Sequence, residues 1–189
     1  MSDLKLNVNK FNEKYYWDHV NENLHCSFSS NFQPKINYFD LDKNYLDIYK
    51  KLLIHEGYLK LPELNWQDTF YNVRDGIIRL KSLNIPPPFI FTYCEPWMLL
   101  TSLNKIIKNL LGDEYIMLPE FWAWFVDPKK QDAGWGPHRD KGRKSLFNDG
   151  KPMSLTIWIP LTDATLDNSC MYLVPANRDS SYLSDDLKI

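Results

Sequence analysis

The sequence predicts an α+β protein in which helices pack against an antiparallel sheet or barrel. Two observations support this class. Apolar residues recur at helical spacing between residues 42 and 112, and aromatic or alternating segments follow Gly112. Helices that precede strands are typical of α+β folds rather than of alternating β–α units. The chain has 189 residues, a length that suits one domain, so we expect a single domain over residues 1–189.

Residues 1–40 are rich in Asn, Lys and aromatic side chains and have weak periodicity. We therefore predict an irregular arm that packs Trp17, Phe28 and Phe32 onto the domain. Its first ten residues are polar and lack the apolar core of a signal peptide, and no stretch of the chain reaches the length of a membrane span. We expect a cytoplasmic protein that does not contact membranes.

Residues 41–112 are predicted to be mainly helical. One helix should run from an Asp42 N-cap to about Glu56, with Gly57 as its stop. After a short strand at residues 58–61, a second helix should cover about residues 67–83 and end before three consecutive prolines. A third helix should begin with Pro96 at its first position and end at Gly112.

Residues 113–189 are predicted to contain the strands. Residues 115–126 are aromatic and β-prone, and a loop rich in Gly, Pro and charge follows over residues 127–152. Residues 154–161 alternate, which places Ser154, Thr156 and Trp158 on one face and puts the apolar residues on the other: Leu155, Ile157, Ile159 and Leu161. Residues 170–174 read as a further strand.

Charge and cysteine usage exclude some classes of protein. The net charge is −2, and the basic residues form no stripe, so we expect no nucleic-acid partner. The three cysteines lie far apart without a C-x-x-C pair, which predicts free thiols in a reducing compartment.

The candidate chemistry lies in His138-Arg139-Asp140. In an extended backbone, residues i and i+2 point to the same side, so the imidazole and the carboxylate could converge on one metal ion. Two His and one carboxylate form the facial triad of non-haem Fe(II) oxygenases. The H-x-D spacing alone is weak evidence, because a loop His and Asp that only hydrogen-bond to each other would produce the same pattern.

The surrounding sequence strengthens the case. Residues 134–140 read Gly-Trp-Gly-Pro-His-Arg-Asp, and residues 154–175 contain Trp-Ile-Pro-Leu, then Asn-Ser-Cys-Met, and end in Pro175. This run resembles bacterial members of the phytanoyl-CoA dioxygenase family. Ser169 stands where the family usually has Gly, which changes the expected backbone of that turn.

The resemblance implies an Fe(II)- and 2-oxoglutarate-dependent dioxygenase that oxidises a small molecule with O₂ and releases succinate and CO₂. It implies a double-stranded β-helix (jelly-roll, cupin-like) core, incomplete in this chain, with N-terminal buttressing helices. His138 and Asp140 would be catalytic iron ligands. Trp158 matches a position beside 2-oxoglutarate in the family, and Thr156 shares its predicted face, which makes it a second cofactor-binding candidate.

A second His ligand and an Arg for 2-oxoglutarate come later in the family's sequences, and neither follows here. The remaining histidines, His19, His25 and His55, all precede the motif. The chain is then either a fragment or a degenerate member of the family. We favour the fragment, because a jelly roll needs about eight strands and only three or four are predicted after Gly112.

Three further hypotheses concern function. A non-catalytic jelly-roll module for binding or structure is the main alternative to an enzyme. The tripeptide also matches a protein-kinase catalytic loop, but position 145 is Ser where that loop needs Asn, so we set this reading aside. Finally, a basic loop could attract an anionic substrate through Arg139, Lys141, Arg143 and Lys144. The oligomeric state is left open.

Overall fold

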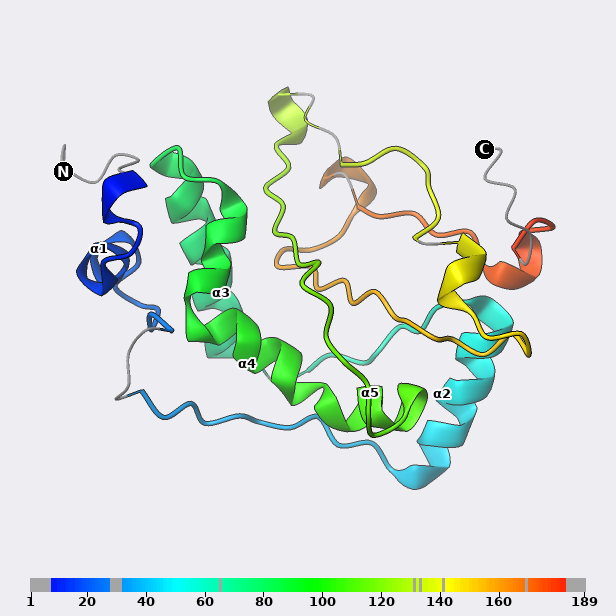
Figure 1. The fold of residues 1–189 in the computed structure, drawn as a ribbon. Helices are drawn as coiled ribbons and strands as arrows, with labels where there is room; N and C mark the ends of the chain where they lie inside the picture. Colours follow the sequence, from blue (N-terminus) through cyan, green and yellow to red (C-terminus); the bar gives the residue numbers. More distant parts are fainter. Residues whose placement is uncertain are drawn as a thin grey trace.

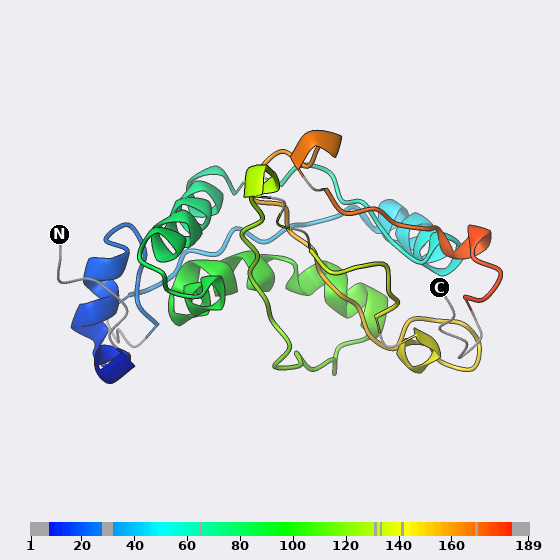
Figure 2. The same ribbon diagram turned by 90° about the horizontal axis from the view of Figure 1, so that it is seen from above.

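A computed structural model describes residues 8–27, 32–64, 66–130, 132, 134–140, 142–168 and 170–182. Helices α1, α3 and α4 gather at one end of the molecule, and α2 and α5 lie at the other (Figures 1 and 2). The α-helices are α1 (Lys14–Val20), α2 (Lys43–Glu56), α3 (Gln67–Ser82), α4 (Cys94–Ser102) and α5 (Asn104–Leu111). Short 3-10 turns are η1 (Val8–Lys10), η2 (Pro87–Thr92), η3 (Pro128–Lys130), η4 (Gly142–Ser145), η5 (Leu166–Asn168) and η6 (Ala176–Arg178).

The main hydrophobic core forms where α1, α3, η2 and α4 meet. Trp17 at its centre is fully buried, and its ring stacks on Phe89 with centroids 5.4 Å apart. The buried hydroxyl of Tyr93 donates a hydrogen bond of 2.8 Å to the Trp17 carbonyl. The rest of this cluster comes from all four elements and includes Val20, Val73, Ile77, Leu80, Ile90 and Leu99.

Helix α1 corrects the prediction of an irregular arm. Its seven residues bury Tyr16, Trp17 and Val20, and these fall on one face at i, i+1 and i+4. The predicted packing of Trp17 is confirmed, whereas Phe28 lies outside the described residues. Phe32 does not enter the core: its ring stacks on that of His25 at a centroid distance of 3.8 Å. The helix was missed because a single short amphipathic turn leaves little periodicity in the sequence.

The predicted helices of the middle segment are confirmed, with one change. Helix α2 begins after Asp42, whose side chain accepts a 2.9 Å hydrogen bond from the backbone N–H of Asn44. Helix α3 agrees with its predicted range. The third predicted helix is divided at Leu103 into α4 and α5, so Pro96 lies in the first turn of α4, not at its first position, and Gly112 ends α5.

The fold-class prediction is wrong. No strand, and hence no double-stranded β-helix, occurs among the described residues, which contain only isolated bridges between Cys26 and Tyr93 and between Leu146 and Pro152. The predicted strands at residues 58–61, 115–126, 154–161 and 170–174 are not β-strands. The bridges among the described residues do not join residues 115–126 to residues 154–161, and Figure 1 draws both segments as coil.

Alternation along these segments nevertheless has a structural counterpart. Ala123 and Phe125 pack against the main helical core, and so do Ile159 and Leu161, whereas Trp122 and Trp124 are exposed. An alternating pattern states only that one face is apolar; it does not state whether a helix or a neighbouring strand covers that face. Here helices cover part of it, because Ile159 and Leu161 pack on the core whereas Ile157 is exposed, so the pattern gave part of the face and the wrong architecture.

The turn η6 is fixed to the C-terminal end of α2, beside which it lies in both ribbon views (Figures 1 and 2). Ala176 is buried there, and the Asn177 side-chain amide donates a 3.0 Å hydrogen bond to Glu56 Oε1. Gly57 ends α2 in the left-handed conformation with φ 75°. A Cβ on Gly57 would lie 2.9 Å from the Cβ of Ala176, so only glycine permits this close approach.

We predict that Gly57→Ala is more destabilising than Gly150→Ala. Both glycines have positive φ, and an alanine there costs about 1–2 kcal/mol in backbone strain. A Cβ at Gly150 meets no atom within 4 Å, whereas at Gly57 it collides with Ala176, which should add about 1 kcal/mol or more. Urea unfolding of both variants measures the difference, and equal losses of stability would contradict the proposed contact.

Candidate functional site

His138 and Asp140 of the H-x-D motif contact each other directly, through the kind of local hydrogen bond that was the alternative to a metal site. His138 Nε2 lies 3.1 Å from Asp140 Oδ1, and both side chains are about half exposed. They belong to an exposed loop, residues 134–140, that has neither helical nor strand structure. The imidazole and the carboxylate meet on one side of the loop, whereas the Arg139 side chain between them contacts Asp179.

The orientation of the His138 ring is set by a backbone carbonyl two residues earlier in the chain. Its Nδ1 lies 2.8 Å from the carbonyl oxygen of Gly136. A carbonyl can only accept a hydrogen bond, so Nδ1 carries a proton in this contact and Nε2 is the ring nitrogen that faces Asp140. Metal-binding histidines commonly donate their second N–H to a backbone carbonyl in this way.

Asp140 is held from its other oxygen. The hydroxyl of Thr156 donates a 2.7 Å hydrogen bond to Asp140 Oδ2, which leaves Oδ1 toward His138. Sequence alternation had grouped Thr156 with Trp158 as residues for a cofactor, but the contact of Thr156 is with the carboxylate. Trp158 is 48% exposed, so it is not a core residue and its ring is accessible.

The spacing of the two donors suits a metal ion. Two adjacent ligands of an octahedral ion, each bound at about 2.1 Å, are about 3 Å apart. The 3.1 Å between His138 Nε2 and Asp140 Oδ1 is close to that value, and it is also the length of the direct hydrogen bond between the two groups. An imidazole nitrogen and a carboxylate oxygen are also the ligand types that Fe(II) takes in the facial triad. The residues present therefore fit two of the three protein ligands.

The other histidines are engaged elsewhere. His19 contacts the Tyr15 carbonyl, His25 pairs with Glu95, and His55 pairs with Glu56. In the part of the chain that the structure describes, no group of three His, Cys, Asp or Glu residues is placed to hold a metal ion. None of the three cysteines forms a disulfide bond, as predicted, and none joins the motif.

An ion pair beside the motif was not predicted. Arg139 Nε and Nη2 donate to both carboxylate oxygens of Asp179, at 2.6–2.9 Å. The hydrogen bonds from Arg139 hold the pKa of Asp179 below its ordinary value. Sequence reasoning had assigned Arg139 to a basic, anion-attracting loop; no local signal pointed to a partner forty residues away.

Exposed aromatic rings lead up to His138. The ring centroids of Trp122 and Trp124, and those of Trp124 and Trp135, are each 5.8 Å apart; those of Trp135 and His138 are 5.5 Å apart. The three indoles are 46–69% exposed. These three indoles make the surface next to His138 apolar and aromatic.

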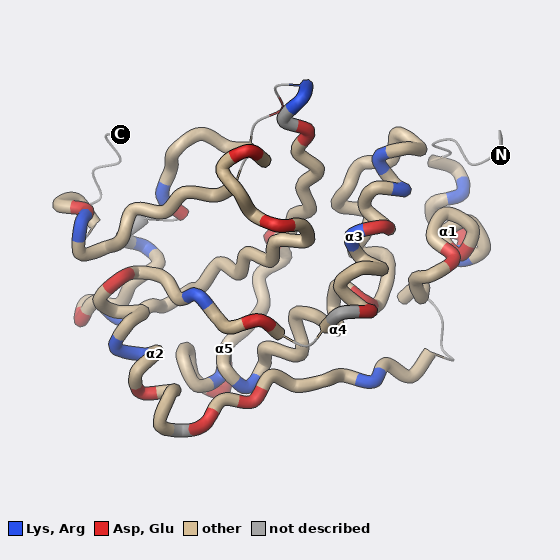
Figure 3. The backbone as a smooth tube through the Cα atoms, turned by 180° about the vertical axis from the view of Figure 1, so that it is seen from behind, with Lys and Arg blue, Asp and Glu red and all other residues tan. Residues whose placement is uncertain are grey.

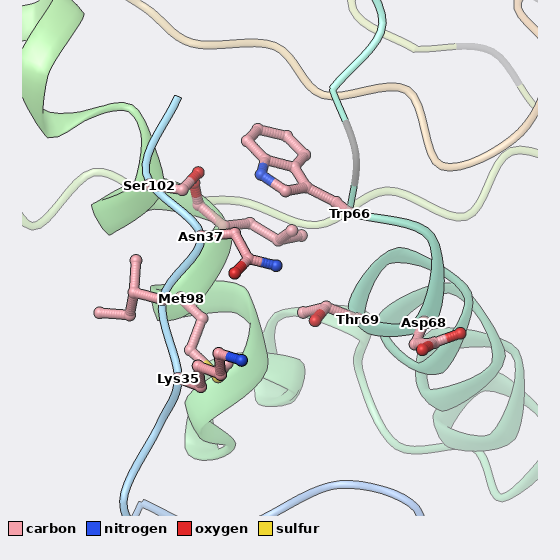
Figure 4. A pocket seen from close by; sticks show the side chains of 9 residues that line it. Lys35, Asn37, Trp66, Asp68, Thr69, Met98 and Ser102 are labelled. Carbon is pink, nitrogen blue, oxygen red and sulfur yellow. The ribbon is translucent and has the colours of Figure 1, made fainter. Parts of the chain in front are cut away.

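The pockets of the described residues lie away from the motif. A pocket of about 200 Å³ opens between residues 35–37 and helices α3 and α4, where Trp66, Thr69 and Ser102 face it (Figure 4). A second, of about 490 Å³, lies between α2 and α5. Neither pocket includes a residue of the motif loop, which is open to solvent.

Charge is mixed over the molecule. Lys and Arg alternate with Asp and Glu along the backbone seen from behind (Figure 3). None of the helices in the described ranges is long and apolar enough to cross a membrane.

Comparison with protein families agrees with the motif. Residues 65–186, more than half of the chain, match the family model for phytanoyl-CoA dioxygenase. The chain belongs to the phytanoyl-CoA dioxygenase family. The match spans His138, Asp140, Thr156 and Trp158, and the resemblance found from residues 134–175 is thereby confirmed. Phytanoyl-CoA dioxygenases are generally Fe(II)- and 2-oxoglutarate-dependent oxygenases. No curated protein and no solved structure matched the chain.

We predict that Asp140→Asn perturbs the ring nitrogens of His138 and leaves those of His19 unchanged. His19 lies far along the chain and contacts a backbone carbonyl, so it serves as an internal control. A long-range ¹H–¹⁵N spectrum of the metal-free protein measures both rings, with His138→Ala to identify the signal. A His138 signal insensitive to Asp140→Asn would contradict the observed contact.

Proposed function

We propose that this chain provides His138 and Asp140 as adjacent Fe(II) ligands in a 2-oxoglutarate-dependent dioxygenase that oxidises a small molecule. The observation that supports this most directly is the 3.1 Å distance between His138 Nε2 and Asp140 Oδ1. The Gly136 carbonyl orients the imidazole, and the Thr156 hydroxyl orients the carboxylate. Membership of the phytanoyl-CoA dioxygenase family supports the reaction class.

Each residue of the site has a separate task. The carbonyl oxygen of Gly136 accepts a hydrogen bond from the Nδ1–H of His138, which presents Nε2 as the ligand atom. Thr156 holds Asp140 Oδ2, which leaves Oδ1 directed at His138 Nε2, where the ion would bind. The chemistry supplied by bound Fe(II) and 2-oxoglutarate is the transfer of one O₂ oxygen to the substrate and the other to succinate, with release of CO₂.

Trp158 is proposed to lie beside 2-oxoglutarate. Its exposed ring is available for such a contact, whereas the hydroxyl of Thr156 is already engaged by Asp140. We therefore assign Thr156 to the carboxylate ligand and not to the co-substrate. The exposed indoles of Trp124 and Trp135 would shield one side of the metal from water.

We predict that Fe(II), titrated anaerobically and followed by 2-oxoglutarate, produces a charge-transfer absorption band that His138→Ala abolishes. The band requires the metal and 2-oxoglutarate together, so it reports on the complete site rather than on adventitious iron. His19→Ala is the matched control, because it removes an exposed imidazole outside the motif. Succinate formation under O₂ then measures turnover. Equal bands in the parent and in His138→Ala would contradict the proposed function.

We predict that Thr156→Val weakens Fe(II) binding and that Thr156→Ser restores it. Valine keeps the shape but lacks the donor to Asp140 Oδ2, and losing a group that orients a ligand typically lowers metal affinity about 10- to 100-fold. Serine keeps the hydroxyl. Anaerobic titration gives the dissociation constants. If valine and serine bound iron equally well, the hydroxyl would have no part in orienting Asp140.

A further inference from the structure

The loop that carries the proposed ligands touches the rest of the protein at few points. Within residues 134–140 every side chain is exposed except that of Arg139. Arg139 reaches Asp179, forty residues along the chain, and both side chains of the pair are only about one-fifth exposed, at 20% and 19%. The contact is two-pointed: Nη2 bonds to Oδ1 at 2.7 Å and Nε bonds to Oδ2 at 2.9 Å.

Asp179 is itself held firmly. Its Oδ1 accepts a 3.0 Å hydrogen bond from the backbone N–H of Ser181, and its own N–H donates to the Ala176 carbonyl at 3.2 Å. Ala176, the buried residue of η6, lies against the C-terminal end of α2 at Gly57. The carboxylate that receives Arg139 is therefore part of a supported turn and not of a free surface chain.

The position of Arg139 gives this ion pair its effect. Arg139 lies between His138 and Asp140 in the chain; those two contact each other and Arg139 contacts Asp179, so an anchor at Arg139 restrains both of its neighbours. A loop anchored there presents both donors outward. The hydrogen bond from Thr156 to Asp140 is a second attachment of this loop, and the ring of Trp135 meets that of Trp124 at a centroid distance of 5.8 Å.

An ordinary exposed ion pair would not have this effect, because solvent screening leaves such pairs worth little. Three features set this one apart: partial burial of both partners, two-point geometry, and support of the acceptor by its own backbone. Only the planar guanidinium of arginine can make the two-point contact; lysine offers a single ammonium group.

We infer that Arg139 and Asp179 form a clamp that joins the loop of residues 134–140 to the end of α2 and holds His138 and Asp140 in their ligand arrangement. Arg139 is thus a positioning residue and not an anion-binding one. The inference rests on the proposed function as far as iron is concerned. The holding of the loop is independent of it and can be measured without metal.

The test compares Arg139→Gln, Asp179→Asn, the double variant and Arg178→Gln. Arg178 is the matched control, because it is an exposed cation next to Asp179 outside the pair. Hydrogen exchange of the metal-free protein follows the amides of residues 134–140. Anaerobic Fe(II) titration follows affinity, and thermal unfolding checks that each variant folds.

The clamp predicts faster exchange in the loop for Arg139→Gln and Asp179→Asn, with Arg178→Gln like the parent. It also predicts that both variants bind Fe(II) about tenfold more weakly, a loss of the size usual for groups that orient ligands. The double variant should bind Fe(II) no more weakly than either single variant, because both substitutions break the same contact. Arg139→Lys should restore only part of the affinity, because it keeps the charge without the two-point contact.

Failure of the clamp and failure of the proposed function give different results. Loop exchange that is unchanged in both Arg139→Gln and Asp179→Asn overturns the clamp, whatever the metal does. Additive losses in the double variant overturn it as well. If the parent and His138→Ala bind iron equally poorly, the proposed function fails, and loop exchange still decides whether the clamp exists.

Discussion

The hydrogen bond from Tyr93 to the Trp17 carbonyl, inside a cluster of stacked aromatic rings, is the interaction on which the rest of the molecule depends. It joins the N-terminal helix α1 to the start of α4, 76 residues along the chain. The two rings are fully buried and meet edge to face at 6.1 Å. The Trp17 carbonyl also accepts the backbone N–H of Asn21, but the buried Tyr93 hydroxyl donates to this carbonyl, and a buried hydroxyl without an acceptor would be costly, so the bond fixes where α1 must lie.

The extended segments use this helical core as their support. Ala123 and Phe125 rest on it from one segment, and Ile159 and Leu161 rest on it from another. Their opposite faces are then turned outward, and there lie Trp124, Thr156 and Trp158. The candidate metal site is thus assembled on the outer side of chain segments whose inner side is hydrophobic. Burial of the inner residues determines where the outer ones stand.

The motif loop is held from two directions. Thr156, which belongs to a segment packed on the main core, binds Asp140. Arg139 connects the same loop to η6 and through it to α2, at the other end of the molecule. The two proposed ligands, His138 and Asp140, lie between these attachments, although each is about half exposed. Their orientation therefore comes from neighbouring groups, as is common for residues around metal sites.

Sequence alone determined what depends on near neighbours in the chain. Helices α2 and α3, the Asp42 cap and the Gly57 stop follow from residues within one or two turns, and the H-x-D motif with its flanking residues identified the family. Tertiary structure decided what depends on distant partners. It showed that helices, not strands, cover the alternating segments. It also showed that Arg139 pairs with Asp179 and that Thr156 donates a hydrogen bond to Asp140. An alternating pattern shows that a face is apolar, and a charged residue shows that a partner or solvent is required. Which segment supplies that cover or partner is decided only when the chain folds.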